Sequence, residues 1–169
     1  MYFLPKPKKL TETNGEFFAE SGIRIVSESE GLKTSTGWAL PKVLRDELLR
    51  YAGVEATLTA GTADKGDISL RLVNALPPQS YVLSITEEQI EILGRDRAGV
   101  GYGIQTLCQI IRNKGALLPA LRIEDKPDIP ARGFYMDQAR GRSFKLDTIK
   151  KQIDLLSRYK LNQYQLYIE

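Results

Sequence analysis

Apolar positions repeat along the chain with two different periods, and each period predicts a different element. Residues 80–94 alternate between apolar and polar on either side of Glu87 and Glu88, which predicts an antiparallel hairpin. Two other segments repeat every three to four residues, as expected of helices that bury one side. Their predicted inner faces are Leu40, Leu44, Leu48 and Tyr51 in the first segment, and Val100, Ile104, Leu107 and Ile111 in the second.

Turn and cap residues set the limits of these elements. Ser35 or Thr36 can cap the first helix and Gly53 can end it, whereas Asp96 can cap the second helix. Gly22 separates two short β-like runs, which is consistent with a hairpin or with two edge strands. Further strand-like runs lie at residues 54–60, 67–73 and 116–125.

The order of these elements limits the architecture of residues 1–126. Strands come first, then a helix, several strands, a second helix and a last strand. Two helices cannot cover both faces of so many strands, so we expect an α+β fold with one mixed or antiparallel sheet and both helices on one face. We expect this domain to have its own core, in which Cys108 is a buried or half-buried free thiol.

Residues 127–169 follow a different pattern. Pro127 and Pro130 favour an extended linker. A continuous apolar strand, an amphipathic helix and a second strand follow within about forty residues, which predicts a βαβ unit with parallel strands. Such a unit cannot bury both faces of its strands alone, so we expect the natural protein to continue. The helix residues expected to face inward are Leu146, Ile149, Ile153, Leu155 and Leu156.

Composition excludes several kinds of site. The chain has 169 residues with one cysteine and no histidine. A disulfide framework, a cysteine-based metal site and imidazole catalysis are therefore excluded from this chain. The apolar stretch before Pro5 is too short for a signal-peptide core, and no apolar run approaches the roughly 20 residues of a membrane helix. We expect a cytoplasmic protein with no membrane partner.

The charged residues do not indicate a nucleic-acid partner. Net charge is +3, and residues 130–169 hold eight Lys or Arg against four Asp or Glu. A solvated basic helix face explains that excess best. Glu124, Asp125 and Asp128 form a carboxylate cluster, but they lack the alternating spacing of a calcium loop, so we interpret the cluster as a solvated turn. No metal site is predicted.

Three closely spaced glycines, Gly99, Gly101 and Gly103, suggest a phosphate loop at first sight. The third glycine of a dinucleotide fingerprint would fall at Ile104, and no Lys-Ser or Lys-Thr pair follows for a P-loop. We therefore interpret these glycines as positions where the start of a helix approaches the sheet closely.

Polar residues follow the two predicted parallel strands. Asp137 and Arg140 come directly after the first apolar strand, and Glu169 ends the second. Ligand-binding groups of α/β proteins collect at the C-terminal ends of parallel strands, which makes these residues candidates for a binding site. The alternative is an ion pair between Asp137 and Arg140 that only stiffens the loop.

The same residues carry a resemblance to a known family. Residues 131–169 contain R-G-(apolar)-D-x-x-R, an amphipathic helix, and then L-N with a strand that ends in an acid. This segment resembles the start of the catalytic barrel of family 20 glycoside hydrolases, the β-N-acetylhexosaminidases. Residues 80–111 and 118–134 resemble the α/β domain that precedes that barrel. The resemblance covers the chain from about Thr36 onward.

The resemblance implies a domain organisation and a reaction. Residues 1–126 would be the non-catalytic N-terminal domain, and residues 127–169 the linker with the first strand, helix and second strand of a (β/α)₈ barrel. The full-length enzyme would release terminal β-linked N-acetylglucosamine or N-acetylgalactosamine with retention by a substrate-assisted mechanism, without a cofactor. An Asp-Glu pair after the fourth strand serves that mechanism. Because no residue of this chain matches the pair, the chain alone is expected to be inactive.

The resemblance also implies roles for three residues. Arg140 matches the arginine that binds the outer hydroxyls of the sugar, and Asp137 would hold that arginine or its loop. Glu169 matches an acid after the second strand that supports the site, where many members have Asp within a longer acidic-polar motif. The expected partner is a carbohydrate substrate, and exposed apolar surface on residues 133–169 would favour self-association.

Two other functions remain open at this point. The α/β domain could be a non-catalytic binding or scaffolding module. The chain could also lead the barrel of a different carbohydrate-active enzyme, since similar domains precede other glycosidase barrels. An adjacent Asp-Glu pair after the fourth strand of the downstream sequence would separate a hexosaminidase from another carbohydrate-active enzyme. A natural reading frame that ended at Glu169 would favour the non-catalytic module.

Overall fold

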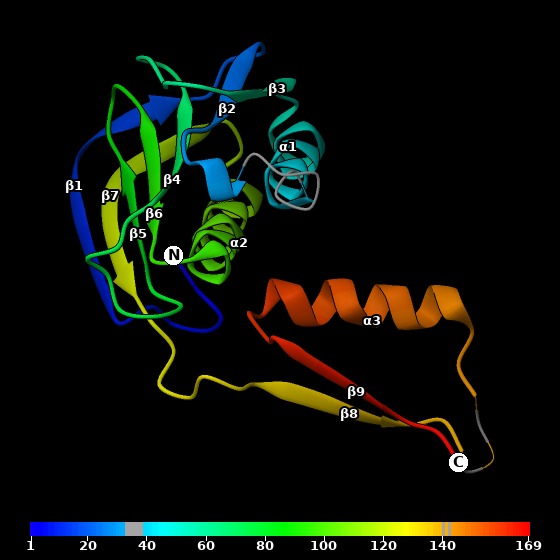
Figure 1. Ribbon diagram of the computed structural model, residues 1–169. Helices are drawn as coiled ribbons and strands as arrows, with labels where there is room; N and C mark the ends of the chain where they lie inside the picture. Colours follow the sequence, from blue (N-terminus) through cyan, green and yellow to red (C-terminus); the bar gives the residue numbers. More distant parts are fainter. Residues whose placement is uncertain (33–38, 140, 142) are drawn as a thin grey trace. The chain divides into compact units, whose positions relative to one another are not determined.

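Seven strands within residues 9–125 form one mixed sheet (Figure 1). The structure is a computed structural model. The chain folds into two compact units, Met1–Pro127 and Asp128–Glu169. The described residues are 1–32, 39–139, 141 and 143–169. Across the sheet of the first unit the strands lie in the order β1-β7-β5-β6-β4-β2-β3. They are β1 (Lys9–Phe18), β2 (Ile23–Ser27), β3 (Ala56–Ala60), β4 (Ile68–Leu72), β5 (Tyr81–Ile85), β6 (Ile90–Gly94) and β7 (Leu117–Asp125).

Antiparallel and parallel pairs meet within this sheet. Strand β5 pairs antiparallel with β6 and β7, and β7 with β1. Strand β2 pairs in parallel with β3 and β4, and β4 with β6. The hairpin predicted at residues 80–94 is confirmed. The prediction around Gly22 is wrong in part, because β1 and β2 form no hairpin and β2 lies inside the sheet. Alternation identifies the face that a strand buries but not its partner.

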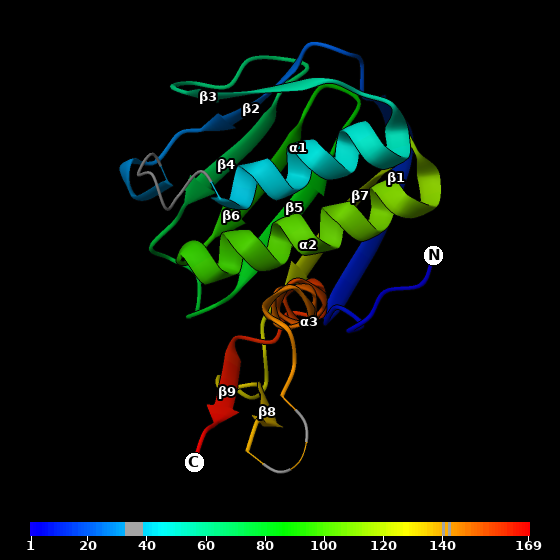
Figure 2. The same cartoon turned by 90° about the vertical axis from the view of Figure 1, so that its right-hand side faces the viewer.

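Two helices lie side by side on one face of the sheet (Figures 1 and 2). They are α1 (Ala39–Ala52) and α2 (Arg97–Lys114), and they pack against each other as well as against the strands. A short 3₁₀-helix, η1 (Glu30–Leu32), follows β2. The prediction of a mixed sheet with both of its helices on one face is confirmed.

The ends of the helices follow the predicted cap chemistry where the structure describes them. Asp96 caps α2, and its Oδ1 accepts a hydrogen bond from the backbone N of Gly99 at 2.8 Å. Gly53 follows α1 with a φ of 68°, a left-handed conformation that glycine adopts without strain. Ser35 and Thr36, the predicted caps of α1, lie outside the described residues.

Helix α2 approaches the sheet closely through its glycines. A Cβ on Gly103 would lie 2.5 Å from Ile92 Cγ2, and a Cβ on Gly99 would lie 2.2 Å from the carbonyl oxygen of Ser80. Neither distance is compatible with a side chain, so the interpretation of this segment as a close approach, rather than a phosphate loop, is confirmed.

The core of the first unit lies between the sheet and the two helices. The predicted core residues that the structure buries are Leu44, Leu48, Ile104, Leu107 and Ile111. Cys108 is a fully buried free thiol, as predicted. Tyr51 was expected on the inner face of α1 but is 39% exposed. It lies in the last turn, where the guanidinium of Arg112 sits 5.8 Å from its ring centroid at the rim of the core.

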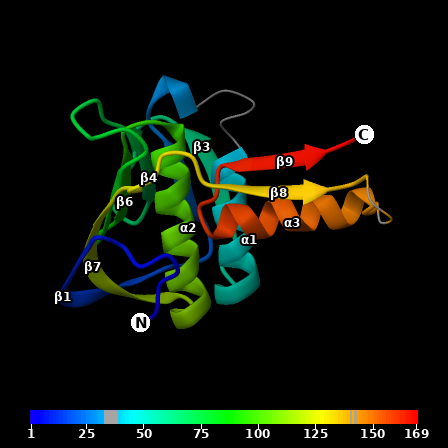
Figure 3. The ribbon, with the colours of Figure 1, turned by 90° about the horizontal axis from the view of Figure 1, so that it is seen from below.

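The second unit is a strand, a helix and a strand (Figure 3). Strand β8 (Gly133–Asp137) pairs in parallel with β9 (Gln163–Tyr167), and α3 (Leu146–Arg158) connects them and runs alongside both. The predicted βαβ unit with parallel strands is therefore confirmed.

The apolar side of α3 is only partly covered, which corrects the predicted burial. Ile149 and Leu156 are half-buried, whereas Leu146, Ile153 and Leu155 are exposed. Two strands are too narrow to cover the apolar stripe of a helix, which spans 100° or more of its circumference. The expected exposure of apolar side chains within residues 133–169 is confirmed for the described residues.

Candidate functional site

The predicted site residues of the second unit lie at the C-terminal edge of its two strands. Asp137 is the last residue of β8 and lies opposite Tyr167, the last residue of β9. Glu169 follows two positions beyond Tyr167. The parallel register therefore brings Asp137 and the end of the chain to one edge, as the sequence predicted. Arg140 lies outside the described residues, so its predicted contact with Asp137 does too.

Alternation along the strands gives the small sheet two chemically different faces. One face carries Phe134 and Tyr164, whose rings stack with centroids 6.2 Å apart. Tyr164 Oη donates a hydrogen bond to Gln152 Oε1 at 2.7 Å, so this face meets α3. The opposite face carries Tyr135 and Tyr167 by the period of two along a strand. Asp137 shares that second face with Tyr135, away from the helix.

The C-terminal edge is ordered by short side-chain contacts. Asp137 Oδ1 accepts a hydrogen bond from the backbone N of Ala139 at 2.8 Å. Tyr167 Oη donates to Glu169 Oε1 at 3.1 Å. Tyr167 also lies against Tyr135, with ring centroids 6.1 Å apart and planes tilted by 33°. Two carboxylates and two phenol rings thus gather at one edge, a combination suited to binding hydroxyl groups.

Gln138 organises the loop between β8 and α3, a role that sequence reasoning missed. Its backbone N donates to the carbonyl oxygen of Tyr167 at 3.0 Å. Its carbonyl oxygen accepts from Ser143 Oγ at 3.1 Å, and its Oε1 accepts from the backbone N of Phe144 at 2.8 Å. One residue therefore fixes both ends of the loop. The only available signal was an amide side chain directly after the strand.

The opposite edge of the unit is closed by Arg132. Its Nε and Nη2 donate to the carbonyl oxygen of Lys160 at 3.0 and 2.8 Å, and its Nη1 donates to the carbonyl oxygen of Ile129 at 2.7 Å. Asn162 Oδ1 accepts from the backbone N of Arg132 at 2.9 Å. The R-G and L-N positions of the motif thus hold the linker against the turn that precedes β9. Their role is structural, and it lies at the edge away from the candidate site.

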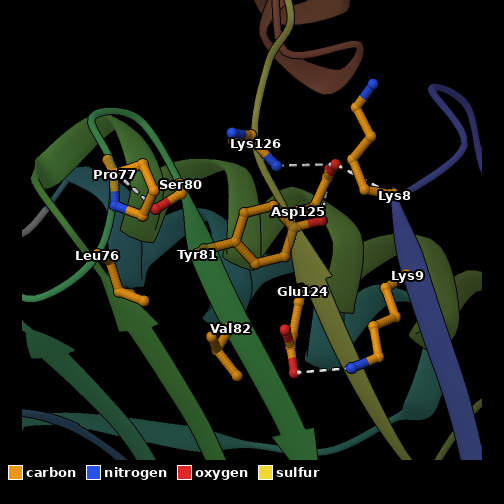
Figure 4. Close-up of a pocket in the computed structure, with 10 residues that line it drawn as sticks. All are labelled: Lys8, Lys9, Leu76, Pro77, Ser80, Tyr81, Val82, Glu124, Asp125 and Lys126. Carbon is orange, nitrogen blue, oxygen red and sulfur yellow. Dashed lines mark hydrogen bonds and ion pairs between the residues drawn. The ribbon is translucent and has the colours of Figure 1, made fainter.

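The first unit contains a groove of about 260 Å³ at the ends of β5 and β7 (Figure 4). Its lining includes Tyr81 and Asp125. Tyr81 Oη hydrogen-bonds with Thr106 Oγ1 at 2.7 Å and donates to Asp125 Oδ2 at 3.1 Å. Asp125 Oδ1 accepts from the backbone N of Lys8 and of Lys126 at 3.2 and 3.0 Å. This carboxylate therefore ties the N-terminal segment to the end of β7.

Electrostatics in this groove favour a structural role over catalysis. Burial raises the pKa of the Tyr81 phenol far above its usual range, so the phenol stays protonated at neutral pH. The Arg122 guanidinium, with help from Lys9, lowers the pKa of Glu124 on the same strand. Both shifts move the pKa away from neutral pH, where a general acid or base works best.

Metal and membrane sites find no support in the described residues. No group of three or more Asp, Glu or Cys residues among them could hold a metal ion. Glu124 and Asp125, which were predicted to lie in a solvated turn, are instead the last two residues of β7, and they are engaged with Arg122 and with backbone N–H groups. No helix in the described part of the chain is both long and apolar enough to cross a membrane.

Comparison with known proteins gives consistent matches. The sequence profile of glycosyl hydrolase family 20, domain 2, matches residues 1–126. A β-N-acetylhexosaminidase of Cellulomonas fimi is 34% identical over 174 residues, which cover 98% of this chain and 34% of that protein. A β-hexosaminidase of Porphyromonas gingivalis is 28% identical over 177 residues, which cover 98% of this chain and 22% of that protein.

A solved structure extends the likeness to the fold. The N-acetyl-β-hexosaminidase of Streptomyces plicatus, in complex with Thio-NAglucal, is similar with a TM-score of 0.85 and 25% identity. The similarity covers 99% of this chain and 34% of that one. The chain thus spans between about a fifth and a third of the length of these relatives. Since the family profile covers most of the sequence, the chain belongs to glycosyl hydrolase family 20.

Proposed function

We propose that this chain is the N-terminal part of a glycosidase that releases terminal β-linked N-acetylhexosamine. The observation that carries the proposal is the extent of the likeness. The alignment with the C. fimi β-N-acetylhexosaminidase covers 98% of the chain, so it runs through the second unit as well as the first. The family profile alone, which covers residues 1–126, would support only the leading domain.

In this proposal the second unit is the first strand, helix and second strand of a (β/α)₈ barrel. Its parallel strands and connecting helix are the repeating unit of such a barrel. The exposed apolar side chains of α3 and β9 support the proposal, because neighbouring barrel elements would cover them. Asp137 and Glu169 then lie at the C-terminal edge, where barrel enzymes place their active sites.

The proposed reaction is substrate-assisted hydrolysis with retention at the anomeric carbon. In that mechanism the acetamido oxygen of the substrate attacks the anomeric carbon. One carboxylate orients the acetamide, and a second acts as general acid and then as general base. Neither of these two residues lies in this chain. Purified 1–169 should therefore not hydrolyse an aryl N-acetyl-β-glucosaminide above the rate in buffer, and turnover that survives a contaminant check would contradict the proposal.

The proposed substrate contacts are Arg140 and Glu169, with Asp137 in support. An arginine presents a planar fork of donors that fits vicinal sugar hydroxyls. In the full-length enzyme, Arg140→Ala should cost about 2–4 kcal/mol of transition-state stabilisation, which lowers kcat/KM by about one and a half to three orders of magnitude. Arg140→Lys should recover only part of the loss, since an ammonium group cannot present the fork. Asp137→Asn should cost less than Arg140→Ala.

A purely structural ion pair predicts a different result for the same variants. Arg140→Ala and Asp137→Asn would then both lower the melting temperature and leave the kinetics of the folded enzyme nearly normal. Kinetics and thermal unfolding measured on the same three variants separate the two explanations. Wild-type kinetics for Arg140→Ala would refute its substrate contact.

A second function is favoured by the self-contained core of the first unit. We infer that residues 1–127 could act without catalysis as a binding or scaffolding domain, because their buried cluster spans the sheet and both helices. The test is to add isolated 1–127 to the enzyme without that region. Restored stability or activity supports the scaffolding role, and no effect in either measurement contradicts it.

A further inference from the structure

Tyr167 occupies a fixed position at the C-terminal edge of the second unit. Its ring lies against Tyr135, with centroids 6.1 Å apart. Its carbonyl oxygen accepts the N–H of Gln138 at 3.0 Å, which joins the end of β9 to the residue that follows β8. Main chain and ring are therefore both held by the neighbouring strand. A side chain fixed in this way can position another group.

The group that Tyr167 contacts is the carboxylate of Glu169. A phenol has a single proton to donate, and Tyr167 Oη donates it to Glu169 Oε1 at 3.1 Å. A free glutamate side chain samples several rotamers, and fixing it costs up to about 2 kcal/mol of conformational entropy. A hydrogen bond from a fixed ring restricts that freedom before any ligand arrives. It occupies one carboxylate oxygen and leaves the other for a second donor.

We propose that Tyr167 is a positioning residue that holds Glu169 ready to accept a hydrogen bond from a hydroxyl group of an N-acetylhexosamine. This inference rests on the proposed function, in which Glu169 contacts the substrate. It goes further by assigning the orientation of that carboxylate to one phenol hydroxyl. Tyr167 itself touches no substrate in this assignment, so its effect passes entirely through Glu169.

The chain offers a matched control on the same strand. Tyr164 also carries a hydroxyl that makes a side-chain hydrogen bond, to Gln152 Oε1 at 2.7 Å. Its ring also lies against an aromatic residue of β8, Phe134. Tyr164 points toward α3, however, and Tyr167 points to the opposite face. Each Tyr→Phe substitution removes one phenol hydroxyl and its hydrogen bond, but only the Tyr167 hydroxyl meets a proposed substrate contact.

The experiment is a double-mutant cycle in the full-length enzyme with Tyr167→Phe, Glu169→Ala and the two combined, and with Tyr164→Phe as control. Two quantities are measured: KM and kcat on an aryl N-acetyl-β-glucosaminide, and the Kd of N-acetylglucosamine by calorimetry. Tyr167→Phe should raise KM and Kd about threefold to tenfold, as for a single lost hydrogen bond, with kcat within about twofold. Tyr164→Phe should leave both constants unchanged.

The combined variant distinguishes a Tyr167 that positions Glu169 from a Tyr167 that only packs against its neighbours. If Tyr167 acts through Glu169, Tyr167→Phe should have no further effect on Kd in the Glu169→Ala background. Additive effects, or wild-type constants for Tyr167→Phe, would overturn the inference. Glu169→Ala with unchanged Kd would overturn it too, because the carboxylate would then contact no sugar. A wild-type enzyme without turnover would overturn the proposed function, and the cycle on Kd would still decide the role of Tyr167.

Discussion

The two units of this chain use the same elements but differ in what those elements bury. Helices α1 and α2 lie on a sheet of seven strands, and residues such as Leu44, Ile92 and Leu107 are inaccessible to solvent. Helix α3 lies on two strands and buries none of its residues, and no described hydrophobic residue of the second unit is buried. Hydrogen bonding between strands therefore does not by itself make a core. A helix needs a sheet wider than its own apolar stripe.

Separating the two units should give the largest difference. Residues 1–127 expressed alone should unfold in one cooperative transition, because their core is contained within them. Residues 128–169 alone should show no cooperative transition, since their apolar side chains stay in contact with water. Circular dichroism on heating measures both. A sharp unfolding transition of residues 128–169 at a temperature independent of protein concentration would contradict the absence of a core in this unit. A transition whose temperature rises with protein concentration would instead indicate self-association.

The next effect sharpens the comparison with one leucine from each unit. In 1–169, Leu107→Ala should lower the free energy of unfolding by about 2–5 kcal/mol, because it leaves a cavity in a closed core. Leu155→Ala should change it by less than about 0.5 kcal/mol, since the side chain is already 50% exposed. Urea titration of both variants provides the measurement. Similar losses for the two leucines would show that α3 is buried in solution.

A smaller effect tests how closely the first unit is packed. Gly103→Ala should lower the free energy of unfolding by about 1–3 kcal/mol, because its Cβ would overlap Ile92 Cγ2. The control is Gly101→Ala on the same helix. Its Cβ would meet only the end of the Leu40 side chain, at 3.1 Å, and alanine is the better helix former by about 1 kcal/mol. Equal stability of the two variants would contradict the close approach.

The smallest effect concerns an exposed charge on the open face of the first unit. The hydrogen bond from Arg122 lowers the pKa of Glu124 in the folded state. This hydrogen bond therefore stabilises the folded state at pH values above the pKa that Glu124 has in the unfolded chain. The stabilisation is lost as the pH falls through the lower pKa that Glu124 has in the folded state. Arg122→Ala should raise the pKa of Glu124 toward its ordinary value, as followed by NMR titration. Arg95→Ala, which instead removes a bond to Asn74, should leave that pKa unchanged.

Local sequence signals predicted most of the elements, because each depends on near neighbours. The β5–β6 hairpin, the Asp96 cap and the close approach at Gly103 all involve residues whose spacing is visible in the sequence. Long-range pairing was not visible. Nothing in the alternation of β1 indicates that its partner is β7, about a hundred residues later. The burial of the apolar side of α3 was overestimated for the same reason. Periodicity shows which side of a helix is apolar, but it does not show how many strands are available to pack against that side.

The candidate site was predictable only as far as strand direction determines it. Parallel pairing brings the ends of β8 and β9 to one edge, which places Asp137 opposite Tyr167. Which side chain contacts which depends on rotamers and ring orientation, and sequence spacing does not encode either. The hydrogen bond from Tyr167 to Glu169 and the loop contacts of Gln138 therefore emerged only from the three-dimensional arrangement.

The pairing of β1 with β7 has a consequence for how the protein is made. A ribosome releases Lys9–Phe18 long before Leu117–Asp125, yet these two strands are neighbours in the sheet. Until translation reaches β7, β1 has no partner, and its backbone is open to pairing with another nascent chain. Completion of the first unit therefore coincides with emergence of the linker. From that point β7 pairs with one side of β1, while the rest of the polypeptide is synthesised.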